Sequence, residues 1–231
     1  MNESPAQYPE KAAPLTTREK ILAEALDLFS VRGYDAVSVR DIAGAVGIKE
    51  SSLYNHFKNK QDIFDSIVRE YSGRWEEIFS SLSLTGADRQ IVVDERTVAM
   101  YKNMTNAQFA AIAGAIFDYY MTDALNVKLR RMLTIEQYGN EDIRALFRRI
   151  SFDDSIDFQS RLFAALMDAG CFVRADPYIL ALEFFSPIFL IFYKYDNDPE
   201  SLARAKALFS RHIGSFTATY GKTPEKEEGA Q

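Results

Sequence analysis

The stretch of sequence that decides the fold covers residues 49–60 and reads Lys49-Glu50-Ser51-Ser52-Leu53-Tyr54-Asn55-His56-Phe57-Lys58-Asn59-Lys60. Its spacing predicts a short helix, a turn and the cap of a longer helix, with Leu53 and Phe57 buried on one face. The opposite face carries serine, tyrosine, asparagine and histidine side chains, and lysines stand at both ends. Hydrogen-bonding groups flanked by cations are what a helix needs to read base edges and meet phosphates. The stretch therefore predicts a DNA-reading helix.

The same capping device punctuates the chain around this stretch. A short polar residue is followed three residues later by an acid, which fits a capping box. The pairs are Thr16–Glu19, Ser38–Asp41 and, more loosely, Asn59–Asp62. The second and third helices would be only about eight and seven residues long, so packing against the first must hold them. Three such helices, with a turn at Gly47 between the last two, predict a helix-turn-helix unit.

Composition favours an all-α protein with a substantial core. The chain has 231 residues, of which 47% are hydrophobic, with only 11 Gly and 7 Pro. Its net charge of −6 excludes binding of nucleic acid through overall charge. Residues 15–60, however, carry seven Lys/Arg against six Asp/Glu, ahead of a more acidic body. The lone Cys171 excludes an internal disulfide, and a buried thiol is favoured over a reactive or metal-binding one.

Beyond residue 82, apolar spacing predicts helices separated by short breaks. They cover 90–104, 106–123, 124–138, 141–150, 154–170, 177–195 and 199–219. Tyr178–Tyr195 is the strongest membrane candidate, but Glu183 and Pro187 interrupt it, and its unbroken apolar run is far shorter than the ~20 residues of a spanning helix. We therefore expect a buried helix in a soluble, cytoplasmic protein.

Several short signatures occur in the first third of the chain. They are Ile21-Leu22-Ala23-Glu24-Ala25, Phe29-Ser30-Val31-Arg32-Gly33-Tyr34, Ser38-Val39-Arg40-Asp41-Ile42-Ala43, Gly47-Ile48 and Ser52-Leu53-Tyr54-Asn55-His56-Phe57-Lys58-Asn59-Lys60. In this order and spacing, over roughly residues 16–70, the chain resembles the TetR family of one-component bacterial transcriptional regulators. The remainder is similar to that family only in length and helical character.

The resemblance implies an Ω-shaped homodimer. It divides the chain into a disordered tail at 1–14, a helix-turn-helix DNA-binding domain at 15–61, a helical ligand-binding and dimerisation domain at 62–221, and a disordered tail at 222–231. The two heads would sit in successive major grooves of a near-palindromic double-stranded DNA operator. A small-molecule effector bound in the C-terminal half would swing the fourth helix and misalign the heads.

The predicted DNA contacts lie on the second and third helices and at helix ends. They are Ser38, Arg40, Lys49, Ser51, Ser52, Tyr54, Asn55, His56 and Lys60. Asn55 suits adenine, and Ser38 and Lys60 stand at helix N-termini, where backbone amides attract phosphate. One of the two serines is expected to cap its helix.

Each of these contacts has a structural alternative. Tyr54 could be a core aromatic and His56 a packing or capping histidine, while Arg40 and the lysines could be solvated. Glu50 opposes phosphate, although a carboxylate at this helix end favours the helix dipole.

Two further sets of residues are predicted in the body. The first lines an effector pocket, with ordinary core packing as the alternative for each residue; it comprises Trp75, Phe79, Met100, Met104, Phe109, Phe117, Tyr120 and Met121. The second forms the dimer interface, because the aromatics between 184 and 193 are too many to bury in one protomer. It comprises Phe185, Ile188, Phe189, Phe192, Leu202, Ala205, Leu208, Phe209, Ile213 and Phe216.

The function favoured by these observations is a ligand-responsive regulator, with repression the family's usual mode and a hydrophobic or aromatic effector. An enzyme lacks support, because the sequence contains no metal-ligand cluster, phosphate loop or nucleophile elbow. No cofactor and no metal are therefore expected. A helical interaction protein with a vestigial helix-turn-helix is the other alternative, and the polar face at Ser51–Asn55 argues against it. Operator, effector and the choice between repression and activation stay open.

Overall fold

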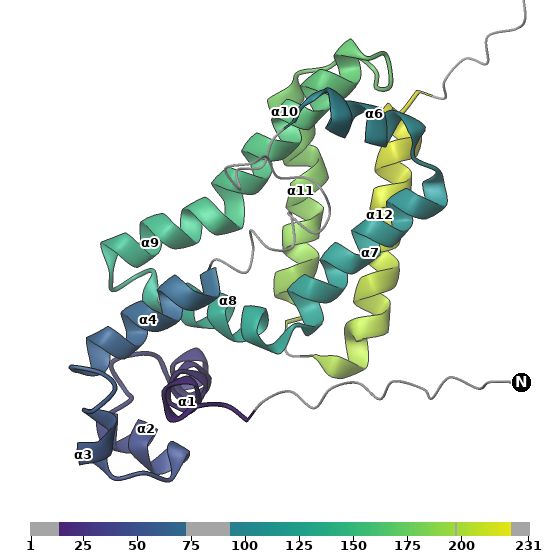
Figure 1. Cartoon of the computed structure of the whole chain (residues 1–231). Coiled ribbons are helices and arrows are strands. Elements are labelled where there is room, and N and C mark those ends of the chain that lie inside the picture. Colours follow the sequence, from purple (N-terminus) through teal and green to yellow (C-terminus); the bar gives the residue numbers. More distant parts are fainter. Residues whose placement is uncertain (1–13, 73–92, 197, 223–231) are drawn as a thin grey trace, which may run out of the picture.

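The protein is all-helical over the part of the chain that the structure describes, which confirms the predicted fold class. The computed structural model describes residues 14–72, 93–196 and 198–222 (Figure 1). Its helices are α1 (Thr17–Arg32), α2 (Val39–Val46), α3 (Glu50–Leu53), α4 (Lys60–Ser72), α6 (Glu95–Asn103), α7 (Asn106–Thr122), α8 (Ala124–Glu136), α9 (Glu141–Arg148), α10 (Asp154–Asp168), α11 (Pro177–Lys194) and α12 (Leu202–Tyr220). A π-helix, η1 (Arg149–Asp153), joins α9 to α10, and a short 3₁₀ turn, η2 (Pro199–Ser201), precedes α12.

Capping residues set where the first helices begin. Thr16 and Ser38 both form the predicted capping boxes, with hydrogen bonds running in both directions between cap and acid. The third box is incomplete. Asn59 accepts a hydrogen bond from the Asp62 amide at 2.8 Å, but the Asp62 carboxylate accepts one from the amide of Lys58, at 2.9 Å, and not from Asn59.

Gly47 makes the turn between α2 and α3. Its φ of 77° and ψ of 29° are left-handed, a conformation that costs other residues about 1–2 kcal/mol. The Gly47 amide bonds back to α2, and the Ile48 amide donates to the Ala43 carbonyl at 3.0 Å. This closes α2 and turns the chain toward α3, as the sequence predicted.

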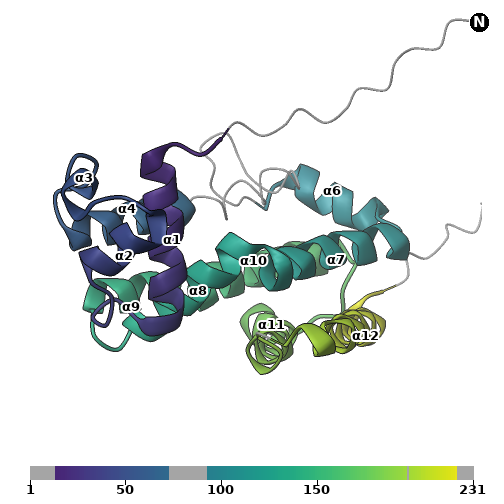
Figure 2. The same ribbon diagram turned by 90° about the horizontal axis from the view of Figure 1, so that it is seen from below.

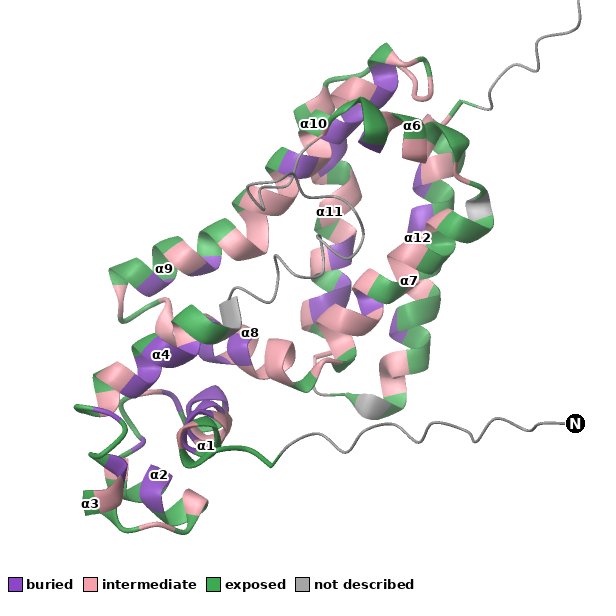
Figure 3. Cartoon of the chain, in the orientation of Figure 1, coloured by how far each residue is buried: buried purple, intermediate pink, exposed green. Residues whose placement is uncertain are grey.

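One hydrophobic core joins the N-terminal helices to the body. Leu53 and Phe57 are buried against residues of α1 and α4, including Ile21, Leu26 and Ile63. The same core continues through buried residues of α8 and α9. Figure 3 shows these buried positions on α1, α4 and α8, where the three helices meet. The four-residue α3 is therefore stabilised by burial of its apolar side chains, at about 1.5–3 kcal/mol each, and not by its own length.

The body is built in two layers. Helices α7, α8 and α10 lie in one layer, and α11 and α12 lie side by side against it (Figure 2). Two aromatic-rich cores fill the space between helices. One surrounds Phe163 and Phe216, and the other surrounds Phe117, Phe192 and Phe209.

Among the described residues, one helix, α11, is long and apolar enough to cross a membrane, judged by length and composition alone. Its buried side chains, among them Leu180, Ile188 and Phe192, pack into the two body cores. Core helices commonly have this composition, so length and hydropathy alone do not indicate a span.

The predicted dimer set needs correction, because most of it is buried within one protomer. Phe185, Phe189, Leu202 and Leu208 are only partly buried. The others lie in the protomer's own cores, where aromatic stacking and helix packing already cover them; they are Ile188, Phe192, Ala205, Phe209, Ile213 and Phe216. The apolar residues that α11 leaves exposed are instead Tyr178, Ile179 and Leu190.

Candidate nucleic-acid interface

The segment after Gly47 presents a polar face outward and an apolar face inward. Tyr54 is 50% exposed, and Asn55 and His56 are exposed beside it. Leu53 and Phe57 are buried beneath them. This orientation is the predicted one, and it leaves hydrogen-bonding groups of the outer face directed at solvent, as a base-reading surface requires. Contact with DNA by these residues stays a prediction.

The helix itself is shorter than predicted, and neither serine caps it. α3 begins at Glu50, so Ser51 and Ser52 lie inside the helix and not before it; Lys49 is the cap residue and makes no side-chain cap bond. A hydrogen-bonded turn follows, in which the His56 amide donates to the Leu53 carbonyl at 2.9 Å. The expected serine cap is therefore wrong.

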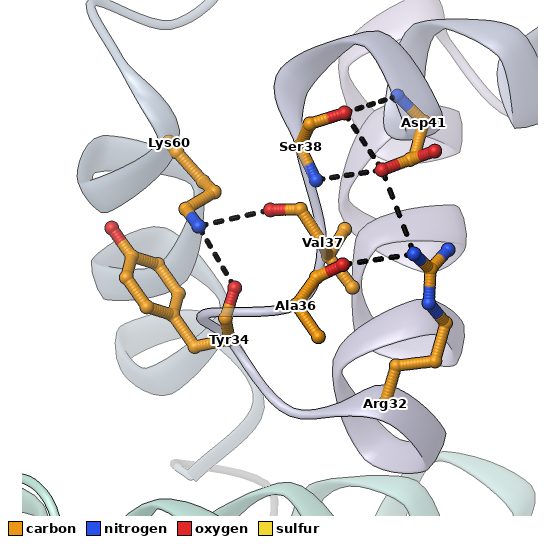
Figure 4. A network of polar contacts seen from close by, with 7 residues as sticks. All are labelled: Arg32, Tyr34, Ala36, Val37, Ser38, Asp41 and Lys60. Carbon is orange, nitrogen blue, oxygen red and sulfur yellow. Dashed lines mark hydrogen bonds and ion pairs between the residues drawn. The ribbon is translucent and has the colours of Figure 1, made fainter.

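Ser38 is committed to its own helix and has no donor left for a phosphate. Its amide and its hydroxyl both donate to one carboxylate oxygen of Asp41, at 2.8 and 2.7 Å (Figure 4). These hydrogen bonds, from side chain and backbone, lower the pKa of Asp41 below its usual value. Arg32 approaches the same carboxylate at 3.7 Å and donates to the Ala36 carbonyl. Ser38 is therefore the N-cap of α2, and in this arrangement its hydroxyl proton is used within its own helix.

The Lys60 side chain binds the loop between α1 and α2. Its ammonium donates to the carbonyls of Tyr34 at 2.8 Å and Val37 at 2.9 Å, and it lies 4.0 Å from the centre of the Tyr34 ring (Figure 4). These bonds fix the start of α4 to the loop that leads into α2. The sequence-based prediction placed this cation on a phosphate; the structure gives it a role in the fold.

The predicted cations Arg40 and Lys49, and the neighbouring Lys58, are placed as a DNA-facing surface requires. Arg40, Lys49 and Lys58 are all exposed, and so is Glu50. Arg40 lies on α2 next to Asp41, and Lys49 and Lys58 flank the reading segment on either side. Their contacts with phosphate or base stay predictions.

An ion pair that the sequence did not indicate connects the first turn of α1 to α4. The Arg18 guanidinium donates to both carboxylate oxygens of Glu70, at 2.6 and 3.1 Å, and lies 5.1 Å from the centre of the Phe57 ring. Arg18 and Glu70 stand 52 residues apart, so no local pattern could have indicated the pair.

The N-terminal helices meet the body mainly at α8. The amide of Tyr34 donates to the Glu136 carboxylate at 2.7 Å, and Lys128 forms an ion pair with Asp27. Gly33, with φ 77° and ψ 162°, passes so close that a Cβ atom there would lie 3.3 Å from side-chain atoms of Ile135 and Glu136. α8 is therefore the part of the body that makes the main contacts with the N-terminal helices.

A large cavity of about 970 Å³ opens between α6, α7, α10, α11 and α12. Of the predicted pocket residues, Met104, Phe109 and Tyr120 line it. Phe117 is fully buried in a core, and Met100 and Met121 pack against cores, so these three do not line this cavity.

Trp75 and Phe79 lie outside the described residues. The sequence reasoning missed the walls contributed by α10, α11 and α12, including Phe163 and Phe184, and by the segment between α10 and α11, including Cys171. Cys171 is half-buried there and its thiol approaches the Ala169 carbonyl at 3.7 Å.

A helix-turn-helix unit with a solvent-facing polar helix, carried on a helical body with an internal cavity, defines a helix-turn-helix DNA-binding protein. Comparison with known sequences agrees. Residues 21–67 match the model of the family described as bacterial regulatory proteins, tetR family. The chain is 36% identical over 72 residues to the HTH-type transcriptional repressor KstR2 of Mycolicibacterium smegmatis, a match over 29% of this chain and 35% of KstR2. It therefore spans about a third of that relative's length.

Solved structures share the fold over most of the chain. One is a TetR-family transcriptional regulator of Mesorhizobium loti, with a TM-score of 0.62 and 19% identity over 89% of this chain and 97% of the other. Another is SmeT, the repressor of the Stenotrophomonas maltophilia multidrug efflux pump SmeDEF, with a TM-score of 0.59 and 21% identity over 93% and 95%. Residues 21–67 thus carry the DNA-binding domain described for the tetR family, and the solved structures show that the chain shares their fold.

Proposed function

We propose that this protein is a DNA-binding transcriptional regulator that represses its target and is released from its operator by a small hydrophobic or aromatic effector. One observation carries the proposal: Tyr54, Asn55 and His56 face solvent together because Leu53 and Phe57 beneath them are buried. The name of KstR2 as a repressor supports repression over activation.

The DNA-contacting set is revised from the structure. We assign base and backbone contacts to Ser51, Ser52, Tyr54, Asn55 and His56, and phosphate contacts to Arg40 and Lys49. These side chains are exposed or half-buried, whereas Ser38 and Lys60 already donate to protein groups. The division into a DNA-binding domain at 15–61 and a ligand-binding and dimerisation domain at 62–221 follows this assignment, with α4 and α8 shared between the two through one core.

Salt-dependent DNA binding tests the proposal. The full chain is titrated against the DNA upstream of its own gene, over a range of salt concentrations. A regulator that neutralises phosphates loses affinity with a slope of about −0.9 per phosphate in a plot of log K against log salt. An affinity that depends neither on the salt concentration nor on the DNA sequence would contradict the proposal.

Response to an effector is proposed on the basis of the cavity. Its lining is mostly apolar and aromatic, with Met104, Phe109, Phe163 and Phe184 among the wall residues. An aromatic or apolar compound should raise the apparent melting temperature of the protein, because it binds the native state, and should release the protein from DNA. A library of such compounds that neither stabilises the protein nor releases DNA would contradict this part of the proposal.

Homodimerisation is proposed to use the outer surface of α11 and α12. Leu190, 63% exposed on α11, is an apolar residue that a partner would cover. Leu190→Glu should therefore shift the sedimentation coefficient toward that of a monomer at micromolar concentration. Tyr138→Glu, a change of an exposed residue beyond α8, is the matched control and should leave the dimer intact. A wild-type chain that sediments as a monomer would overturn the dimer.

A further inference from the structure

A cluster of two cations and one anion lies between α8 and the residue that follows the C-terminal end of α11. Asp196, just after α11, accepts hydrogen bonds from Arg130 Nη2 at 2.6 Å and from Arg131 Nε at 2.8 Å. Two guanidiniums thus share one carboxylate. Burial of Asp196 raises its pKa, but the two arginines outweigh burial and hold that pKa below its usual value. The cluster therefore keeps a net positive charge at neutral pH.

Arg130 also has a hydrogen-bond donor without an acceptor. Its side chain is only 10% exposed, and its Nε atom is buried with no partner, the one such side-chain nitrogen or oxygen among the described residues. The hydroxyl of Tyr193, whose ring lies near the Arg130 guanidinium, forms a hydrogen bond with the Thr134 hydroxyl at 3.2 Å. A buried donor of a charged group left unsatisfied costs about 1–3 kcal/mol or more, so such groups in folded proteins call for an explanation.

The space beside Arg130 has room for a small polar group. A chamber of about 50 Å³ is lined mostly by apolar and aromatic residues, its polar side chains include those of Arg130, Ser151 and Asn126, and none of the described residues lining it is acidic. Roughly 10–15 Å³ of such volume is enough for one water, so the chamber admits a group of a few atoms. Ser151 belongs to η1, and π-helical turns often occur at functional sites.

The chamber adjoins the large cavity. Tyr120, Phe185 and Phe192 line both. A ligand whose apolar part fills the 970 Å³ cavity could therefore place one end against Arg130 by passing between these rings.

We infer that the effector is an amphipathic acid, whose carboxylate accepts a hydrogen bond from Arg130 Nε in the small chamber and whose apolar remainder occupies the large cavity. This inference rests on the proposed ligand response and specifies the chemistry of the ligand. A carboxylate fits better than a neutral acceptor because the cluster carries two cations and one anion, and because guanidinium–carboxylate hydrogen bonds are roughly twice as strong as neutral ones.

The position of Arg130 links this site to the DNA-reading part of the molecule. Arg130 lies on α8, between Lys128, which pairs with Asp27 of α1, and Glu136, which holds the amide of Tyr34. An acid bound at Arg130 would compete with Asp196 for the guanidinium. It would thereby act on α8, the helix that contacts the N-terminal helices.

Matched acid and amide probes test the inference. Decanoic acid and 4-phenylbutyric acid are each compared with their own primary amide, by calorimetric titration and thermal shift of the full chain at neutral pH. Each acid should bind at least tenfold more tightly than its amide. Arg130→Gln should abolish that preference. Arg131→Gln, which removes the other cation from Asp196 but leaves the buried Nε of Arg130, should keep it.

The outcomes separate this inference from the proposed function. Amides that bind as tightly as acids, or an acid preference that survives Arg130→Gln, would overturn the carboxylate site and leave ligand response standing; a water on Arg130 Nε would then explain the donor. Absence of binding by acids, amides and a wider apolar library would overturn ligand response itself. If Arg130→Gln fails to fold, Arg130→Lys retains a cation opposite Asp196 without the Nε–H, and a tenfold acid preference retained there also overturns the inference.

Discussion

Replacement of Lys60 by methionine separates a structural lysine from a phosphate-binding one. Lys60→Met keeps the length of the side chain but removes an ammonium that donates to the carbonyls of Tyr34 and Val37 and lies over the Tyr34 ring. A hydrogen bond to a charged group contributes about 1.5–3 kcal/mol when buried, and a cation–π contact about 0.5–1 kcal/mol at an exposed site. Lys60 is only half-buried, so water partly replaces these contacts. We expect a net loss of about 2 kcal/mol.

The assay is urea unfolding followed by circular dichroism at a fixed protein concentration, together with the salt dependence of DNA binding. The midpoint should fall without a change in m value, as it does when stability alone changes. Lys58→Met, at an exposed lysine two residues earlier, is the control and should alter stability by no more than about 0.5 kcal/mol.

The opposite result would refute the reasoning. If Lys60 bound a phosphate instead of the loop, Lys60→Met would leave the urea midpoint unchanged and would reduce the salt slope by about 0.9 for each lost contact. A stable variant with a reduced slope would restore the sequence-based prediction.

Two further perturbations test the charge cluster around Asp196 and the close approach of Gly33 to α8. Asp196→Asn should destabilise the protein by about 2–3 kcal/mol at pH 7, because it leaves the nearly buried Arg130 without its anion. The folded-state pKa of Asp196 is lowered, so its contribution to the free energy of unfolding is present above about pH 4 and is lost as the pH falls. In urea unfolding, the stability difference between wild type and variant should therefore narrow at pH 3. A difference that stays constant with pH would exclude the ion pair as its cause. Gly33→Ala should cost more stability than Gly47→Ala, about 2–3 against about 1–2 kcal/mol in the same assay, because both force a positive φ but only Gly33 also crowds Ile135 and Glu136 of α8. Equal losses would show that the close approach to α8 is unimportant.

Sequence reasoning succeeded where the information is local. The capping boxes at Thr16 and Ser38 and the left-handed Gly47 depend on residues within a few positions of one another, and all were predicted. The outward face of Tyr54 followed from the spacing of Leu53 and Phe57, which is also local.

Prediction from the sequence failed where residues that contact each other lie far apart along the chain. Lys60 was assigned to phosphate because it stands at a helix N-terminus, and the sequence did not show its loop partners, which lie 26 and 23 residues away. The aromatic residues of α11 were assigned to a dimer because a sequence cannot show that Phe192 stacks on Tyr120 and Phe209 of the same protomer. The unsatisfied Nε of Arg130 is likewise visible only when α8, η1 and α11 are brought together.

Binding of the Tyr54→Ala and Asn55→Ala variants to a selected operator tests the central claim most directly. The operator is obtained by selecting random DNA with the wild-type chain, and affinities are then measured by fluorescence anisotropy at fixed salt. Each variant should lose about 1–3 kcal/mol of binding, with Asn55→Ala also relaxing base preference at one position, while the urea midpoint stays at that of the wild type. Selection that enriches no sequence, or variants that bind the operator as tightly as the wild type, would contradict the account.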